Sequence, residues 1–161
     1  MGLDMYLYLQ KHEYRFCCDK SEEEKERIKK DFYPEEMEEL SKSIPDDCLS
    51  KTCKYNVAYW RKANAIHKWF VDGPGEGVDE CQMIYVTPEL LETLVMTCSQ
   101  VLMDHSKAGE LLPTEDGFFF GSTEYDEWYF QDLEDTVKML DPVLKFIKKH
   151  PEYEIYYRAS W

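Results

Sequence analysis

The sequence has no long hydrophobic run, since no apolar stretch approaches the ~20 residues that span a bilayer. Its start, with Asp4 between apolar residues, carries no basic segment followed by an apolar one, so no secretory signal is expected. Basic residues are also few, with 19 Lys and Arg against 33 Asp and Glu, which gives a net charge of -14. This charge argues against direct nucleic-acid binding and against adsorption to anionic membranes, and we expect a cytoplasmic protein.

Catalytic motifs are missing as well. The sequence holds no Gly-x-Ser-x-Gly elbow, no phosphate-binding P-loop and no catalytic cysteine signature. Its six cysteines are expected to be thiols in a cytoplasmic protein. The spacing leaves open a zinc site of His12 and Cys17–Cys18 with Cys48 and Cys53, although adjacent cysteines rarely give tetrahedral geometry. We expect no cofactor, no metal, and a binding role rather than catalysis.

The length of 161 residues and the 43% hydrophobic content predict a single domain over residues 1–161. Apolar residues alternate with polar ones over Leu3–Leu9 and again over Tyr153–Tyr157, a pattern that predicts one strand near each end of the sequence. Shorter strands are predicted at Met83–Val86 and Phe118–Phe120. The sheet that these strands form is expected to be small and mostly antiparallel.

Three main helices are expected to pack on this sheet. The first runs from about Val57 to Val71 and is closed by a Gly-Pro-Gly stop. The second begins at Thr87-Pro88, a cap followed by proline at the first helical position. The third follows Gly121-Ser122-Thr123 and should kink or restart at Pro142. The predicted fold class is therefore α+β.

A charged insertion is expected at about residues 19–50. Residues 19–47 hold twelve acidic side chains against six basic ones, and Ser21 with Glu24 forms a capping-box pattern. We interpret the segment as a solvated, mobile helical insertion without chemistry of its own.

The segment from Lys51 to Val71 is cationic, with five basic residues and no acid. In the predicted helix, Trp60, Asn64 and His67 share one edge beside Arg61. These four residues offer, in that order, a stacking ring, an amide, a titratable donor and a forked cation. Such a set of groups suits a planar or anionic ligand. The alternative interpretation is structural, with the cations paired to acids elsewhere in the fold.

A second candidate segment lies before the third predicted helix. Ser122 and Thr123, with free N–H groups at a helix start, could receive a phosphate or carboxylate. The helix itself carries a stripe that includes Tyr125 and Trp128, and its acids at Asp132 and Asp135 could instead pair with Arg61 or Lys62. The candidate ligand-binding residues are Trp60, Arg61, Asn64, His67, Ser122, Thr123, Tyr125 and Trp128. A catalytic alternative uses His67 with Asp126 or Asp132.

Three segments carry a resemblance to a known family: MGLDMYLY at residues 1–8, YWRKANAIHKWFVD at residues 59–72, and LLPT with GFFFGSTEYDEWYF at residues 111–130. The chain resembles a family of small uncharacterised proteins encoded by bacteriophages and prophages, and YYRASW at residues 156–161 fits it too. The resemblance implies the cytoplasm of an infected bacterium as the setting. It implies no particular activity and no particular ligand.

The resulting hypothesis is a phage accessory protein that acts by binding. It would interfere with host defence by sequestering a small anionic or nucleotide-like ligand, or by blocking a host protein. Two alternatives remain open: a small hydrolase or transferase, and an acidic mimic of nucleic acid. The high aromatic content, 15% of the residues, also leaves room for a homodimer interface.

Overall fold

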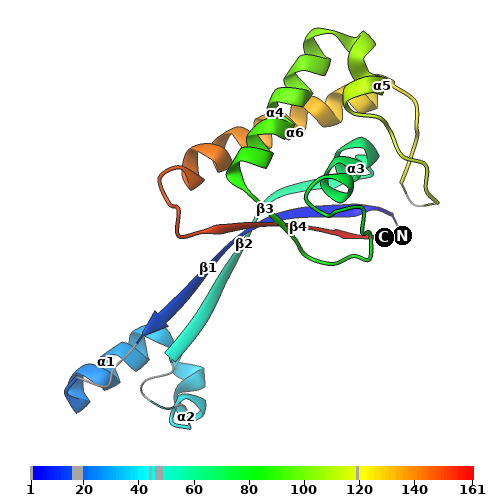
Figure 1. Cartoon of the computed structure of the whole chain (residues 1–161). Coiled ribbons are helices and arrows are strands. Elements are labelled where there is room, and N and C mark those ends of the chain that lie inside the picture. The colour runs from blue at the N-terminus through cyan, green and yellow to red at the C-terminus, as the bar shows by residue number, and fades with distance from the viewer. Residues whose placement is uncertain (1, 16–19, 44, 46–48, 119) are drawn as a thin grey trace. The chain divides into compact units, whose positions relative to one another are not determined.

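A computed structural model describes residues 2–15, 20–43, 45, 49–118 and 120–161 of the chain. These residues form two compact units. The larger unit comprises Met1–Gln10 and Lys54–Trp161, and the smaller one comprises Lys11–Cys53. Helices and a four-stranded antiparallel sheet make up the fold, so the α+β prediction is confirmed (Figure 1).

The sheet has the strand order β2-β1-β4-β3. Its strands are β1 (Asp4–Arg15), β2 (Leu49–Arg61), β3 (Ile84–Val86) and β4 (Glu154–Ser160). β4 pairs antiparallel with both of its neighbours, placing Ser160 opposite Asp4 on one side and Tyr157 opposite Ile84 on the other. The strands predicted near the two ends of the sequence are therefore neighbours in the sheet.

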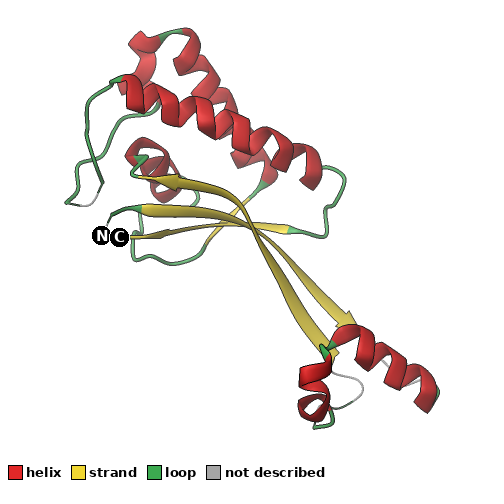
Figure 2. Ribbon diagram, turned by 180° about the vertical axis from the view of Figure 1, so that it is seen from behind, coloured by secondary structure: helices red, strands yellow, loops and turns green. Residues whose placement is uncertain are grey.

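The larger unit carries its helices on one face of this sheet (Figure 2). They are α3 (Asn64–Asp72), α4 (Pro88–Met103), α5 (Ala108–Leu111) and α6 (Glu127–Ile147), with a 3-10 turn at His105–Lys107. Thr87 caps α4 by accepting a hydrogen bond from the Leu90 N–H, and Pro88 occupies the first helical position, as predicted. α4 and α6 pack side by side.

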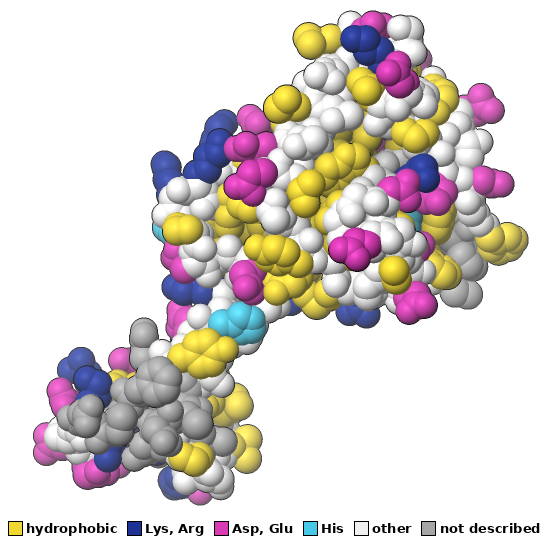
Figure 3. Space-filling view, in the orientation of Figure 1, with side chains coloured by type: hydrophobic (Ala, Val, Ile, Leu, Met, Phe, Trp, Pro, Cys, Tyr) yellow, Lys and Arg dark blue, Asp and Glu magenta, His cyan; other side chains and the backbone are white. Residues whose placement is uncertain are grey.

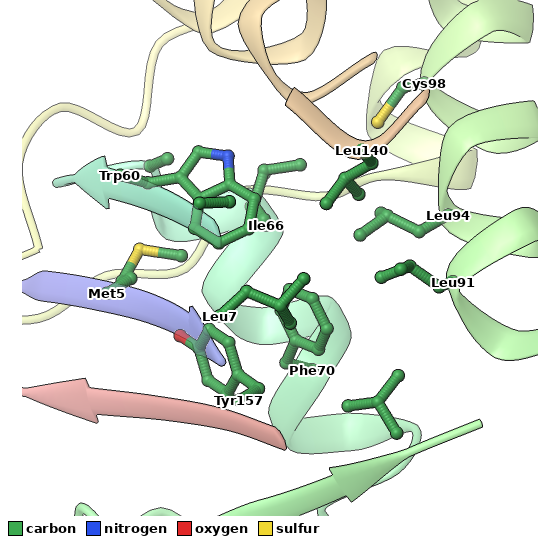
Figure 4. Close-up of a cluster of buried hydrophobic side chains, with 14 of the residues drawn as sticks. Met5, Leu7, Trp60, Ile66, Phe70, Leu91, Leu94, Cys98, Leu140 and Tyr157 are labelled. Carbon is green, nitrogen blue, oxygen red and sulfur yellow. The ribbon is translucent and has the colours of Figure 1, made fainter. Parts of the chain in front are cut away.

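The core lies between the sheet and these helices, as Figure 4 shows. Met5 and Leu7 of β1 point into it, while Tyr6 and Tyr8, which alternate with them, stay partly exposed on the other face. Phe70 of α3 stacks on Tyr157 of β4 with ring centroids 4.0 Å apart. The period-two alternation predicted from the sequence thus decides which side of the sheet is buried.

The first predicted helix is wrong over its opening residues. Val57–Arg61 belong to strand β2, and helix α3 begins only at Asn64. Val57, Tyr59 and Trp60 are β-branched or aromatic residues, which suit a strand beside β1. Lys62 then adopts a positive φ of 62°, which ends the strand and cannot continue into a helix.

The last predicted helix starts later than expected, and the short strand before it is also wrong. Phe118 and Phe120 lie in a turn, and Phe119 is outside the described residues. Gly121 adopts a φ of 92°, so Ser122 and Thr123 stay in a loop. α6 begins at Glu127 and continues through Pro142 to Ile147 without a restart.

The smaller unit contains α1 (Glu22–Phe32), a 3-10 turn at Glu35–Met37 and α2 (Glu38–Ser41). The predicted capping box is confirmed, because Ser21 accepts from the Glu24 N–H while the Glu24 carboxylate accepts from the Ser21 N–H. Phe32 is buried here against Ile28 and Tyr33. Among the residues that the structure describes, none of the helices is long and apolar enough to cross a membrane.

Candidate functional site

The candidate site is built around the turn that joins β2 to α3. Lys62 stands at this turn in a left-handed conformation, and two glycines flank its side chain. A Cβ atom at either Gly2 or Gly121 would lie 3.3 Å from carbon atoms of Lys62. The glycines therefore leave room for the lysine stem, which is packed although the residue is exposed.

Helix α3 begins without a side-chain cap. Its N-cap residue, Ala63, offers no acceptor for the first-turn N–H groups. The backbone N–H groups of Ala65 and Ile66 have no acceptor among the described residues, whereas the His67 N–H donates to the Ala63 carbonyl. An uncapped helix start of this kind presents free donors and a partial positive charge.

A cavity of about 360 Å³ lies against this helix start. The β2–α3 turn forms one wall, the first two turns of α6 form the opposite wall, and Gly121 and Ser122 close one side. The lining residues are Arg61, Lys62, Ala63, Asn64, Ala65, Ile66, Gly121, Ser122, Asp126, Trp128, Tyr129, Asp132 and Leu133. The volume is in the range of small-molecule sites.

The two cations of this cavity lack an ionic partner in the part of the chain that the structure describes. Neither Arg61 nor Lys62 forms an ion pair or a side-chain hydrogen bond with any described residue. The expected pairing with Asp132 or Asp135 is not formed, because Asp135 accepts from Gln131 and lies 3.5 Å from the Lys138 ammonium. The structural explanation therefore fails for Arg61 and Lys62, whereas it holds for Lys51, which pairs with Glu13, and for Lys68, which pairs with Asp72.

Two carboxylates line the opposite wall. Asp126 is the N-cap of α6 and uses one oxygen to accept from the Trp128 and Tyr129 N–H groups. The Asp132 carboxylate has no hydrogen-bond or ion-pair partner among the described residues. Burial, and then the negative charges of Asp135 and Asp126, raise its pKa to about 7.

Because burial raises this pKa, neutralising Asp132 should stabilise the protein at high pH. The folded state binds the proton more tightly than the unfolded chain, so stability is lost as pH rises from about 4 through about 7. We expect Asp132→Asn to raise the free energy of unfolding at pH 8 by about 1–2 kcal/mol, after allowance for solvent screening. At pH 4 the variant and the original protein should be equal within a few tenths of a kcal/mol.

Urea unfolding at the two pH values measures this difference. Asp116→Asn removes an exposed carboxylate with the same change in net charge and should show no pH-dependent gain. An equal gain for both variants would assign the effect to net charge rather than to the position of Asp132.

Four of the eight predicted site residues line the cavity: Arg61, Asn64, Ser122 and Trp128. The Asn64 amide forms its hydrogen bonds within the protein: it donates to the Phe120 and Ser122 carbonyls and accepts from the Glu115 N–H. Trp128 is 78% exposed, so its ring is available for stacking.

Trp60 and His67 do not lie on the edge predicted for them. Trp60 is a strand residue, buried, and donates its ring N–H to the Thr136 hydroxyl at 2.8 Å. His67 is fully buried, with Nδ1 2.7 Å from the Tyr157 hydroxyl and Nε2 3.1 Å from an Asp79 oxygen. The catalytic pairing of His67 with a carboxylate of α6 is therefore not formed.

Thr123 and Tyr125 also lie outside the cavity lining. The Thr123 carbonyl accepts from the Thr114 hydroxyl, and Tyr125 packs edge-on against Tyr129. The charged lining residues that the predicted ligand set lacks are Lys62, Asp126 and Asp132. Asp126, followed by the apolar spacing of α6, is an N-cap signal that could have placed the helix start correctly.

No group of three or more His, Cys, Asp or Glu residues in the described parts of the chain could hold a metal ion. Cys17, Cys18 and Cys48, which the zinc alternative needs, lie outside those parts. Comparison of the chain with protein-family models, with curated proteins and with solved structures gives no match. The resemblance to phage-encoded proteins remains a prediction.

Proposed function

We propose that the protein binds a small ligand with an anionic group in the cavity between the β2–α3 turn and α6. The observation that carries this proposal is the set of unsatisfied positive groups on one wall. Arg61 and Lys62 have no ionic partner among the described residues, and the first-turn N–H groups of Ala65 and Ile66 have no acceptor there. Phosphates and carboxylates bind to such helix starts.

We base the proposed biological role on the resemblance to phage proteins. In an infected bacterium, an accessory protein of this kind would sequester a small anionic or nucleotide-like molecule on which host defence depends. The cavity is large enough for such a ligand. The alternative of an acidic nucleic-acid mimic is less well supported, because acidic side chains are dispersed among hydrophobic and uncharged ones on the face seen in Figure 3.

Titration calorimetry with ribose 5-phosphate tests the proposal. Arg61→Ala should weaken binding about tenfold or more, since a charge-assisted hydrogen bond to phosphate is lost. The melting temperature should change by no more than about 2 °C, because an exposed and unpaired side chain contributes little to stability.

Lys68→Ala is the matched control. It removes the same charge from α3, but Lys68 pairs with Asp72 at 2.7 Å and does not line the cavity. Binding should survive this change. Equal losses in both variants would indicate attraction to net charge, and an absence of binding to the unaltered protein would refute the site.

Asp132 gives a second candidate function, because a carboxyl group with a pKa of about 7 is suited to general acid–base catalysis. The alternative hydrolase or transferase would then use Asp132 rather than His67. Native mass spectrometry separates the two functions. A binding protein retains its ligand and returns it intact on denaturation, whereas an enzyme returns product.

A further inference from the structure

The wall of the cavity opposite the cations restricts the ligand further. An anionic group satisfies Arg61 and Lys62, but it would be repelled by the carboxylates of Asp126 and Asp132. The Asp132 carboxylate has no partner among the described residues, so its accessible oxygens are available to accept from N–H donors of a ligand. The best-matched ligand therefore carries an anionic group at one end and N–H donors at the other.

The remaining lining favours a flat, largely apolar body between these two ends. Ile66, Leu133 and Tyr129 are buried directly behind this lining, and Trp128 is its exposed apolar residue. The exposed indole of Trp128 stands one helical turn before Asp132 and offers a face for stacking. A planar heterocycle can stack on this indole while its edge reaches the Asp132 carboxylate.

Among the common nucleobases, one presents the matching edge. An ionised carboxylate accepts two parallel N–H bonds, as it does from arginine. Guanine carries two adjacent donors, N1–H and N2–H, on one edge. Adenine and cytosine place an acceptor beside their amino group, and uracil has a single N–H between two carbonyls.

We propose that the ligand is a guanine nucleotide, with its phosphate at Arg61, Lys62 and the start of α3, and its base between Trp128 and Asp132. This inference rests on the proposed anion-binding function and adds the identity of the base. It assigns Asp132 a role in specificity and Arg61 a role in affinity for the phosphate. No covalent step is involved.

Titration calorimetry at pH 8, where Asp132 is ionised, tests the base assignment with four probes: guanosine, inosine and adenosine 5′-monophosphates, and ribose 5-phosphate. The guanosine nucleotide should bind at least about tenfold more tightly than the inosine nucleotide, which lacks the N2 donors. The adenosine nucleotide should bind no better than ribose 5-phosphate, since its edge brings an acceptor to the carboxylate.

Asp132→Asn should lower affinity for the guanosine nucleotide about tenfold or more, because an amide cannot accept both N–H bonds with two oxygens. Affinity for ribose 5-phosphate should stay the same or rise, because a nearby negative charge is removed. Asp116→Asn, at an exposed position outside the cavity, should change neither value. Circular dichroism confirms that each variant is folded.

The outcomes separate the two proposals. If ribose 5-phosphate and all three nucleotides bind equally well, and Asp132→Asn changes none of them, the guanine assignment is overturned while the anion site stands. If none of the four probes binds to the unaltered protein, the anion site itself is refuted. Preference for the guanosine nucleotide that survives in Asp132→Asn would also overturn the role given to Asp132.

Discussion

Replacing His67 with alanine is expected to lower the free energy of unfolding by about 4 kcal/mol. The imidazole is fully buried, and its two nitrogens contact the Tyr157 hydroxyl and an Asp79 oxygen. Truncation leaves a cavity beside Phe120, whose ring packs edge-on against the imidazole at 5.1 Å. It also strands a buried hydroxyl without a partner, which adds to the cost.

Two further variants separate these contributions in urea unfolding. His67→Phe keeps the ring volume but removes both polar contacts, so we expect about half of the loss, roughly 2 kcal/mol. His12→Ala removes an exposed histidine that contacts the Thr52 hydroxyl and the Tyr14 ring, and it should cost no more than about 1 kcal/mol. A loss of less than about 1 kcal/mol for His67→Ala would show that the buried network contributes little to stability.

Replacing Asn64 with alanine should cost about 3 kcal/mol and also abolish ligand binding. The side chain holds the segment from Glu115 to Ser122 with three hydrogen bonds, two donated to carbonyls and one accepted from an N–H. These bonds keep Gly121 and Ser122 in place as one side of the cavity. Their loss releases that side, so stability and binding should fall together.

Unfolding measurements combined with calorimetry test this coupling. Asn56→Ala removes an exposed amide from β2 and should affect neither property. Binding lost at full stability would contradict the coupling, because it would mean that Asn64 contacts the ligand directly rather than through the loop.

The strands near the two ends of the sequence could be predicted because a half-buried strand leaves a period-two pattern that needs no knowledge of its neighbours. The same local reasoning failed at Tyr59 and Trp60. Their spacing to Ala63, Ile66 and Phe70 imitates one face of a helix, but the positive φ of Lys62 divides the segment into strand and helix. Nothing in the pattern of apolar residues reports such a turn.

The candidate site was predictable in part for a related reason. Composition marked Arg61 as a cation in an acidic protein, and the cavity lining includes two other predicted residues, Ser122 in the loop before α6 and Trp128 in α6 itself. The role of Asp132 could not be read from the sequence, because its pKa depends on burial and on neighbours that the fold supplies. The helical position of Asp132 alone suggested an ion pair with Arg61 or Lys62, and the structure does not contain that pair.

The pairing of β4 has a consequence for how the chain folds. β4 lies between β1 and β3, so the centre of the sheet cannot form until Asp4 of β1 has paired with Ser160 of β4. Contacts this distant in sequence make folding slow and leave the apolar side of β1 unprotected during synthesis. Residues 4–10 therefore remain without this partner until residues 154–160 have been synthesised, and their apolar side chains are open to aggregation during that delay.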